Sequence, residues 1–236
     1  SKDEQVQKEI KEKRREINKL LKQQREEYSQ FCKDNRLSTD TYRLQIAKVH
    51  GINNTDIISK PIKIPEGVAK IRGMTEDIEK EIQKGFDDIE HEYNVQLNVD
   101  IKKIDPDVPF ECIYDNSADT VKRCIIINSA YDFSSIQYIV EESNRIDYFA
   151  GRSIADYIRH EAAHYMTGLN ITGSQEFERF HKTVKRCYVP GVSGYSDVMK
   201  DGFETIAEAF VKIHNGEAVP EEAKKLVIQL IERWKK

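Results

Sequence analysis

The stretch SIADYIRHEAAHYMTGLN, residues 153–170, has the spacing of a helix that is buried along one side. Ser153 is suited to cap the start of this helix, Asp156 falls in its first turn, and Gly168 is suited to end it. Apolar residues recur between these signals at helical intervals. The stretch therefore predicts a helix that packs against the core of a domain.

Two histidines and an acid interrupt the apolar pattern of this helix. His160 and His164 are four residues apart, so on a helix their imidazoles lie on one face and can converge on one metal ion. Glu161 lies at the edge of that face, where its carboxylate can hold a water bound to the metal. This HExxH pattern predicts zinc with two histidine ligands and a glutamate general base. The alternative, a helix that exposes these side chains to solvent, agrees less well with the regular apolar spacing.

A catalytic zinc needs a third protein ligand, and the best candidates lie in SGYSDVMKDGFETIAEAF, residues 193–210. Glu204 and Glu208 are again four residues apart, with small alanines beside them. Burying two carboxylates on an apolar helix is costly unless positive charge meets them. One of them could bind the metal while the other hydrogen-bonds a ligand histidine. The alternative is an amphipathic helix with a solvated acidic face.

The rest of the chain predicts an α+β domain, because a helix and a small sheet precede several further helices. Turn-forming stretches, DPDVP and DNSAD, separate the expected strands. The expected helices span residues 75–93, 133–149, 153–168, 174–188, 203–214 and 220–235, and the expected strands span residues 95–101, 110–114 and 121–128.

A separate N-terminal region is expected ahead of this domain. Residues 2–31 have the charge and apolar stripe of a long amphipathic helix, within an arm of residues 1–50. This arm would either mediate self-association and docking or pack on its own domain. The stretch GINNTDIISKPIKIPEG, residues 51–67, has the composition of a linker. The domain itself is expected over residues 68–236.

Composition excludes several classes of function. The chain of 236 residues has a formal net charge of −4, so no basic face for nucleic acid is expected. No apolar run approaches the length of a membrane span, and no secretory signal is visible. We therefore expect a cytoplasmic or virion-associated protein rather than a secreted one, although a chain that does not begin with Met leaves an upstream signal open. Its four cysteines form no CxxC pair, which argues against a cysteine-bound zinc cluster.

The motifs resemble a known family of proteases. HEAAH (160–164), followed by Tyr195 and then ETIAEAF (204–210), is similar to the catalytic domain of the anthrax lethal factor family. That family is a branch of the gluzincin metalloendopeptidases, which also includes the Pro-Pro endopeptidases. The resemblance implies a zincin-like metalloprotease fold, a zinc cofactor and a peptide or protein substrate.

The resemblance also implies a role for each matching residue. The implied zinc ligands are His160, His164 and Glu204. Glu161 would be the general base, and Tyr195 would donate a hydrogen bond to the oxyanion. Glu208 would hold a ligand histidine in place without contacting the metal. The chain departs from the family in having Ala162-Ala163 inside the motif and a slightly longer gap after Tyr195. That gap leaves Tyr188, in CYVPG, as the alternative oxyanion donor.

Two further expectations concern partners. An extended substrate would pair with the edge of the sheet, and the strand at 121–128, last before the HExxH helix, is expected to provide that edge. The segment QQREEYSQFCKDNRLSTDTYRLQIAKVHG (23–51) resembles the end of phage minor capsid and head-morphogenesis proteins. That resemblance implies phage capsid partners and an alternative function, in which the chain is a structural or docking protein of a phage head that retains a protease-like fold.

Overall fold

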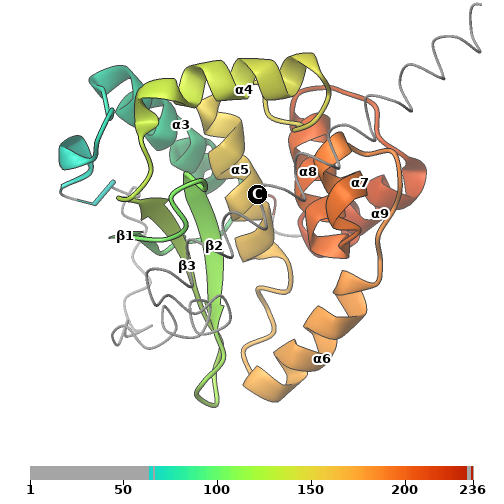
Figure 1. Cartoon of the computed structure of the whole chain (residues 1–236). Helices are drawn as coiled ribbons and strands as arrows, with labels where there is room; N and C mark the ends of the chain where they lie inside the picture. The colour runs from blue at the N-terminus through green and yellow to red at the C-terminus, as the bar shows by residue number, and fades with distance from the viewer. Residues whose placement is uncertain (1–63, 66, 233–234, 236) are drawn as a thin grey trace, which may run out of the picture. The chain divides into compact units, whose positions relative to one another are not determined.

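The computed structural model describes residues 64–65, 67–232 and 235. Within these residues the chain forms a small three-stranded sheet with helices around it, which is the expected α+β arrangement (Figure 1). The predicted arm at 1–50, with its amphipathic helix, and nearly all of the predicted linker at 51–67 lie outside the described residues.

The helices and strands follow the order expected from the sequence. Their bounds are η1 Val68–Lys70, α3 Glu76–Glu92, β1 Val99–Lys102, β2 Phe110–Asp115, β3 Lys122–Asn128, η2 Phe133–Ser135, α4 Ile136–Arg145, α5 Ile154–Met166, α6 Ser174–Lys185, α7 Gly194–Met199, α8 Gly202–His214 and α9 Glu221–Leu230. None of the helices in this described part has the length and apolar content needed to cross a membrane.

Several bounds differ from the prediction. The helix expected at 133–149 ends at Arg145, and the helix expected at 220–235 ends at Leu230. The first strand pairs only from Val99 onward, because the buried side chains of Val95 and Leu97 enter the core before the chain reaches the sheet. The short helix α7 lies in a stretch for which no helix was predicted, because its three glycines favour a loop. A capping box at Ser193, which accepts from the backbone N–H of Ser196, starts this helix.

The sheet has the strand order β1-β3-β2, with β3 parallel to β1 and antiparallel to β2. The prediction that the strand at 121–128 forms the substrate-facing edge was therefore wrong, because β3 is the central strand. Its three successive isoleucines at 125–127 are fully buried, as expected of a central strand. The edge next to α5 is β2 (Figure 1).

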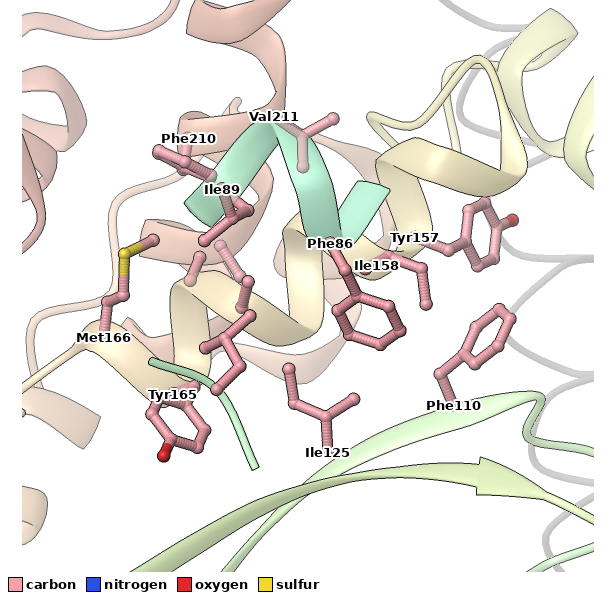
Figure 2. Packing of buried hydrophobic residues seen from close by; sticks show 14 of the residues in the cluster. Phe86, Ile89, Phe110, Ile125, Tyr157, Ile158, Tyr165, Met166, Phe210 and Val211 are labelled. Carbon is pink, nitrogen blue, oxygen red and sulfur yellow. The ribbon is translucent and has the colours of Figure 1, made fainter. Parts of the chain in front are cut away.

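Helix α5 lies between the sheet and α8, and α3 packs along it. Figure 2 shows Phe110 and Ile125 of the sheet pointing toward Phe86 of α3 and Ile158 of α5. All four side chains are almost or entirely buried. Burial of an apolar side chain of this size contributes roughly 1.5–3 kcal/mol, so this packing holds the HExxH helix rigidly against the sheet.

The HExxH helix begins and continues as its sequence predicts. The side chain of Ser153 caps it by accepting from the backbone N–H of Asp156. Ala162 and Ala163, which depart from the family pattern, have no exposed surface. Their small size therefore suits core positions rather than a solvent-facing part of the motif.

Gly85 allows α3 to approach α5 closely. A Cβ added at Gly85 would lie 2.6 Å from the Cβ of Ile158 and 2.8 Å from the carbonyl oxygen of Ala155. Real Cβ atoms do not come this close, so any side chain at this position would push the two helices apart.

We predict that Gly85→Ala destabilises the protein by about 2 kcal/mol, although alanine is the better helix former by roughly 1 kcal/mol. Thermal denaturation should show a fall in Tm of about 4–8 °C. Gly173→Ala is the control, because no atom lies within 4 Å of the Cβ it would add. A Gly85→Ala protein with an unchanged or higher Tm would contradict this account of the helix crossing.

Candidate metal centre

The structure brings together the three residues expected to hold a metal, His160, His164 and Glu204. The Nε2 atoms of the two imidazoles are 3.1 Å apart. Oε2 of Glu204 lies 3.2 Å from Nε2 of His160 and 3.4 Å from Nε2 of His164. The helical spacing of the histidines on α5 and the position of Glu204 in the first turn of α8 therefore converge on one point.

The triangle of donor atoms has the size that a small tetrahedral ion needs. For metal–ligand distances of about 2.0–2.1 Å, the ligand atoms of a tetrahedron lie roughly 3.3–3.4 Å apart. Oε2 of Glu204 is buried and accepts no well-aligned hydrogen bond from the described residues, although both imidazoles are within ion-pair distance. A cation between the three atoms would satisfy this oxygen, so the residues fit a bound metal ion.

The electrostatics of the site also favour positive charge. Burial alone would lower the pKa of His160, but the adjacent carboxylates of Glu204 and Glu208 raise that pKa well above its ordinary value. Burial alone would raise the pKa of Glu204, but the two histidines outweigh burial and lower it. The imidazoles and the carboxylates thus stabilise each other's charged forms. Because three glutamates, Glu161, Glu204 and Glu208, lie beside the two imidazoles, a divalent cation would be attracted to the triangle.

Glu208 lies behind His160, as expected from the sequence. Its side chain is fully buried, and its Oε1 is 2.8 Å from Nδ1 of His160. Its Oε2 accepts a hydrogen bond from the backbone N–H of Ala150 at 2.9 Å. The carboxylate can only accept, so Nδ1 of His160 carries a proton and Nε2 is the nitrogen that faces the triangle, where its lone pair could bind a metal ion.

Glu161 lies beside the metal ligands and is fixed by the sheet. Its Oε2 accepts a hydrogen bond of 2.6 Å from the backbone N–H of Cys112 on β2. Burial raises the pKa of Glu161, and although the charges of His160 and His164 oppose this effect, the pKa stays above its ordinary value. One carboxylate oxygen is thus anchored, and the group binds a proton more readily than an exposed glutamate does.

The hydrogen bond from Cys112 to Glu161 indicates which backbone groups of β2 point away from β3. The backbone N–H of Asn128 donates to the carbonyl of Pro109 at 3.0 Å, so these two residues form a hydrogen-bonded pair next to the ladder between β2 and β3. Along an antiparallel ladder, alternate residues turn their backbone groups inward and outward. The backbone groups of Phe110, Cys112 and Tyr114 therefore point away from β3, on the side where Glu161 lies.

Tyr195 reaches the site from α7. Its ring centroid is 6.2 Å from that of His160, and its backbone N–H donates to the carbonyl of Tyr148 at 2.7 Å. Burial and the nearby carboxylates raise the pKa of Tyr195 well above its ordinary value. Its hydroxyl therefore keeps its proton and is available to donate a hydrogen bond.

Tyr188, the alternative oxyanion donor, forms its hydrogen bond elsewhere. Its hydroxyl donates to Oδ1 of Asp197 at 3.0 Å, and the same oxygen accepts from the backbone N–H of Gly191 at 2.8 Å. Tyr188 thus braces the loop that leads into α7, whereas the ring of Tyr195 contacts His160, one of the candidate ligands.

Sequence reasoning missed three aromatic residues around the triangle. The hydroxyl of Tyr114 donates to the backbone carbonyl of His164 at 2.7 Å, and the ring of Phe203 lies 6.4 Å from that of His164. Phe149 lies 5.6 Å from His160. Because side chains alternate along a strand, the sequence at 110–114 could have placed Tyr114 on the same face of the sheet as Phe110 and Cys112. No local pattern indicates the position of Phe149.

Comparisons of the chain with protein-family models, with curated proteins and with solved structures find no match. Two imidazole nitrogens and a carboxylate oxygen are donors for a borderline divalent metal, with a second carboxylate held beside them.

We predict that the protein binds one divalent zinc ion per chain and that binding depends on Glu204. Glu204→Gln, which removes a charged ligand, should weaken zinc binding by more than about 100-fold. Glu208→Gln, which removes only the support of His160, should weaken it about 10–100-fold. Calorimetric titration with zinc and metal analysis of the purified protein measure both effects.

Glu178→Gln is the control, because Glu178 lies exposed on α6 in an ion pair with Lys182. This change should leave the affinity for zinc unaltered, and circular dichroism should show that all three variants are folded. If Glu204→Gln binds zinc as tightly as the unaltered chain, Glu204 is not a ligand.

Proposed function

We propose that this protein is a zinc-dependent endopeptidase with a zincin-like fold. One observation carries the proposal, which is that the carboxylate of Glu161 lies beside a triangle of three metal-binding atoms and is fixed there by the backbone of β2. A metal that only stabilises a fold is normally enclosed by four protein ligands and needs no base beside it. Three ligands with an adjacent base are typical of hydrolytic sites.

Zinc is the metal that this set of donors suits best. Two neutral imidazoles and one carboxylate are the ligands of zinc in many hydrolases, and they leave a fourth position for water or substrate. When bound, zinc would polarise the carbonyl of the peptide bond and lower the pKa of a water molecule. His160, His164 and Glu204 would hold the ion, and Glu208 would keep His160 in the correct tautomer.

Glu161 would act as the general base and then as the general acid. Because its Oε2 is anchored on Cys112, the other oxygen is the one that would take a proton from the attacking water. The raised pKa of this buried carboxyl helps it to hold the proton until the C–N bond breaks. It would pass the proton to the nitrogen as that bond breaks, so that the leaving group departs as an amine.

Tyr195 would stabilise the negative charge that develops on the carbonyl oxygen. Its hydroxyl keeps its proton because its pKa is raised, and its ring lies against His160. A donor of this kind stabilises the transition state more than the neutral carbonyl of the substrate.

An extended substrate would pair with the outer edge of β2. The backbone groups of Phe110 and Tyr114 and the carbonyl of Cys112 point outward beside Glu161, so a peptide added to this edge would pass close to the metal triangle. Main-chain pairing of this kind holds a peptide extended and presents successive carbonyl groups to the site.

The resemblance of the motifs to the lethal factor family supports the same function. The alternative, a structural or docking role in a phage head, depends on the segment at 23–51, which lies outside the described residues. A purely structural protein would have no use for a carboxylate held beside the metal-binding atoms, so the intact position of Glu161 favours the enzyme.

We predict that Glu161→Gln abolishes peptide cleavage while leaving the fold and the affinity for zinc intact. An amide cannot accept the proton of the attacking water, and proton transfer by a placed base contributes roughly 100- to 10,000-fold. A peptide library analysed by mass spectrometry identifies a cleaved sequence, on which the rate of the variant is then measured. Glu178→Gln should cleave at the unaltered rate, whereas a fully active Glu161→Gln protein would show that the base lies elsewhere.

We predict that Tyr195→Phe lowers kcat by about 100- to 1,000-fold and changes KM little, because the lost hydrogen bond forms mainly in the transition state. Tyr188→Phe is the matched control, since it removes a hydroxyl that donates to Asp197 instead. Steady-state kinetics and thermal denaturation of both variants test this assignment. Equal activity of Tyr195→Phe and the unaltered chain would remove Tyr195 from the mechanism.

A further inference from the structure

Phe149 is held between two tyrosines at the metal centre. Its ring stacks on Tyr195 with centroids 4.4 Å apart and on Tyr157 with centroids 5.0 Å apart, and the planes meet at 20° in both pairs. The ring of His160 lies 5.6 Å from the same phenylalanine. Because Tyr157 belongs to α5 and Tyr195 to α7, the stack joins these two helices beside a metal ligand.

The backbone around Phe149 is tied to the same elements. The carbonyls of Asp147 and Tyr148 accept hydrogen bonds from the N–H groups of Gly194 and Tyr195, at 2.9 and 2.7 Å. On the other side of Phe149, the N–H of Ala150 donates to Glu208. Residues 147–150, which we call the strap, therefore contact both the tyrosine at the site and the carboxylate behind His160.

Two features keep the strap in place. Asp147 adopts a left-handed backbone conformation, with φ of 52°, and its carboxylate binds the ammonium group of Lys212 at 2.7 Å. Gly194 lets the strap come close to α7, because a Cβ there would lie 3.1 Å from the Cα of Tyr148. These features fix the strap on the N-terminal side of Phe149, and the hydrogen bond from Ala150 to Glu208 fixes it on the other side.

We infer that Phe149 is a positioning residue, which fixes the phenol of Tyr195 beside the metal triangle by holding its ring in a stack backed by Tyr157. A tyrosine side chain can rotate about two bonds, and a flat partner on one face restricts both rotations. This inference rests on the proposed function, in which the hydroxyl of Tyr195 stabilises the oxyanion. A misplacement of about 1 Å at a reacting group can cost roughly 100-fold in rate.

The kinetic test is a double-mutant cycle. Phe149→Leu keeps the apolar volume but removes the flat ring, so kcat should fall about 10- to 100-fold with little change in KM. In the Tyr195→Phe background the same change should lower kcat no further, because the hydroxyl that Phe149 positions is already absent. Phe149→Tyr, which restores a flat ring, should recover most of the rate. Equal losses of kcat in both backgrounds would overturn the inference.

Phe180→Leu is the matched control for a general loss of packing. Phe180 is a half-buried aromatic residue like Phe149, but its ring contacts are with Phe177 and Phe203. The two leucine variants should lower Tm to a similar extent, and only Phe149→Leu should lower kcat. If Phe180→Leu lowers kcat as much, the effect is structural and the inference is wrong.

A second measurement does not depend on catalysis. In protein labelled with 13C-tyrosine, the ring signals of Tyr195, identified by their loss in Tyr195→Phe, should be shifted upfield by the stacked ring of Phe149. Phe149→Leu should remove that shift, and Phe180→Leu should preserve it. A Tyr195 signal that does not respond to Phe149→Leu would overturn the inference.

The two measurements separate the inference from the proposed function. If the unaltered chain cleaves no peptide but the signal of Tyr195 responds to Phe149→Leu, the proposed function fails while Phe149 still positions the tyrosine. If the chain cleaves peptides and the cycle is additive, the proposed function stands and the inference about Phe149 falls.

Discussion

The carboxylate of Glu208 is buried without any exposed surface, and the rest of the site depends on how that charge is satisfied. An unpaired buried carboxylate would cost several kcal/mol, so both of its oxygens require donors. His160 and the backbone of Ala150 provide them, from α5 and from the strap. One buried charge thus fixes α8 against α5, sets the tautomer of His160 and anchors the chain segment that carries Phe149.

The site as a whole gathers negative charge where water is largely excluded. Glu161, Glu204 and Glu208 lie around two imidazoles between α5 and α8, and the raised pKa of His160 is an electrostatic consequence. Such a cluster is unfavourable by itself, and a divalent cation in the triangle would make it favourable. We therefore regard metal binding as part of the stability of this helix pair as well as the basis of its proposed chemistry.

Local sequence patterns predicted the helices that carry the ligands, because spacings of four residues are a property of one helix and survive in any fold. The same sequence patterns gave no correct prediction for features that depend on contacts between segments far apart in the sequence. The strand at 121–128 is a continuous apolar run, which signals burial but not strand order, and it proved central rather than at the edge. Tyr195 was expected in a loop, because a helix of six residues containing glycine has no periodicity to detect. No sequence pattern indicated the role of Phe149, because its ring stacks on residues 157 and 195, which are distant in the sequence.

X-ray absorption spectroscopy of the zinc-loaded protein tests the central claim most directly, because it reports the atoms bound to the metal without needing a substrate. The account predicts four nitrogen or oxygen neighbours at about 2.0–2.1 Å, with the multiple scattering of two imidazoles from His160 and His164. Cys112, whose backbone N–H donates to Glu161, would be an alternative source of a sulfur ligand. Sulfur at about 2.3 Å, or a shell of oxygen atoms without imidazole, would contradict the account.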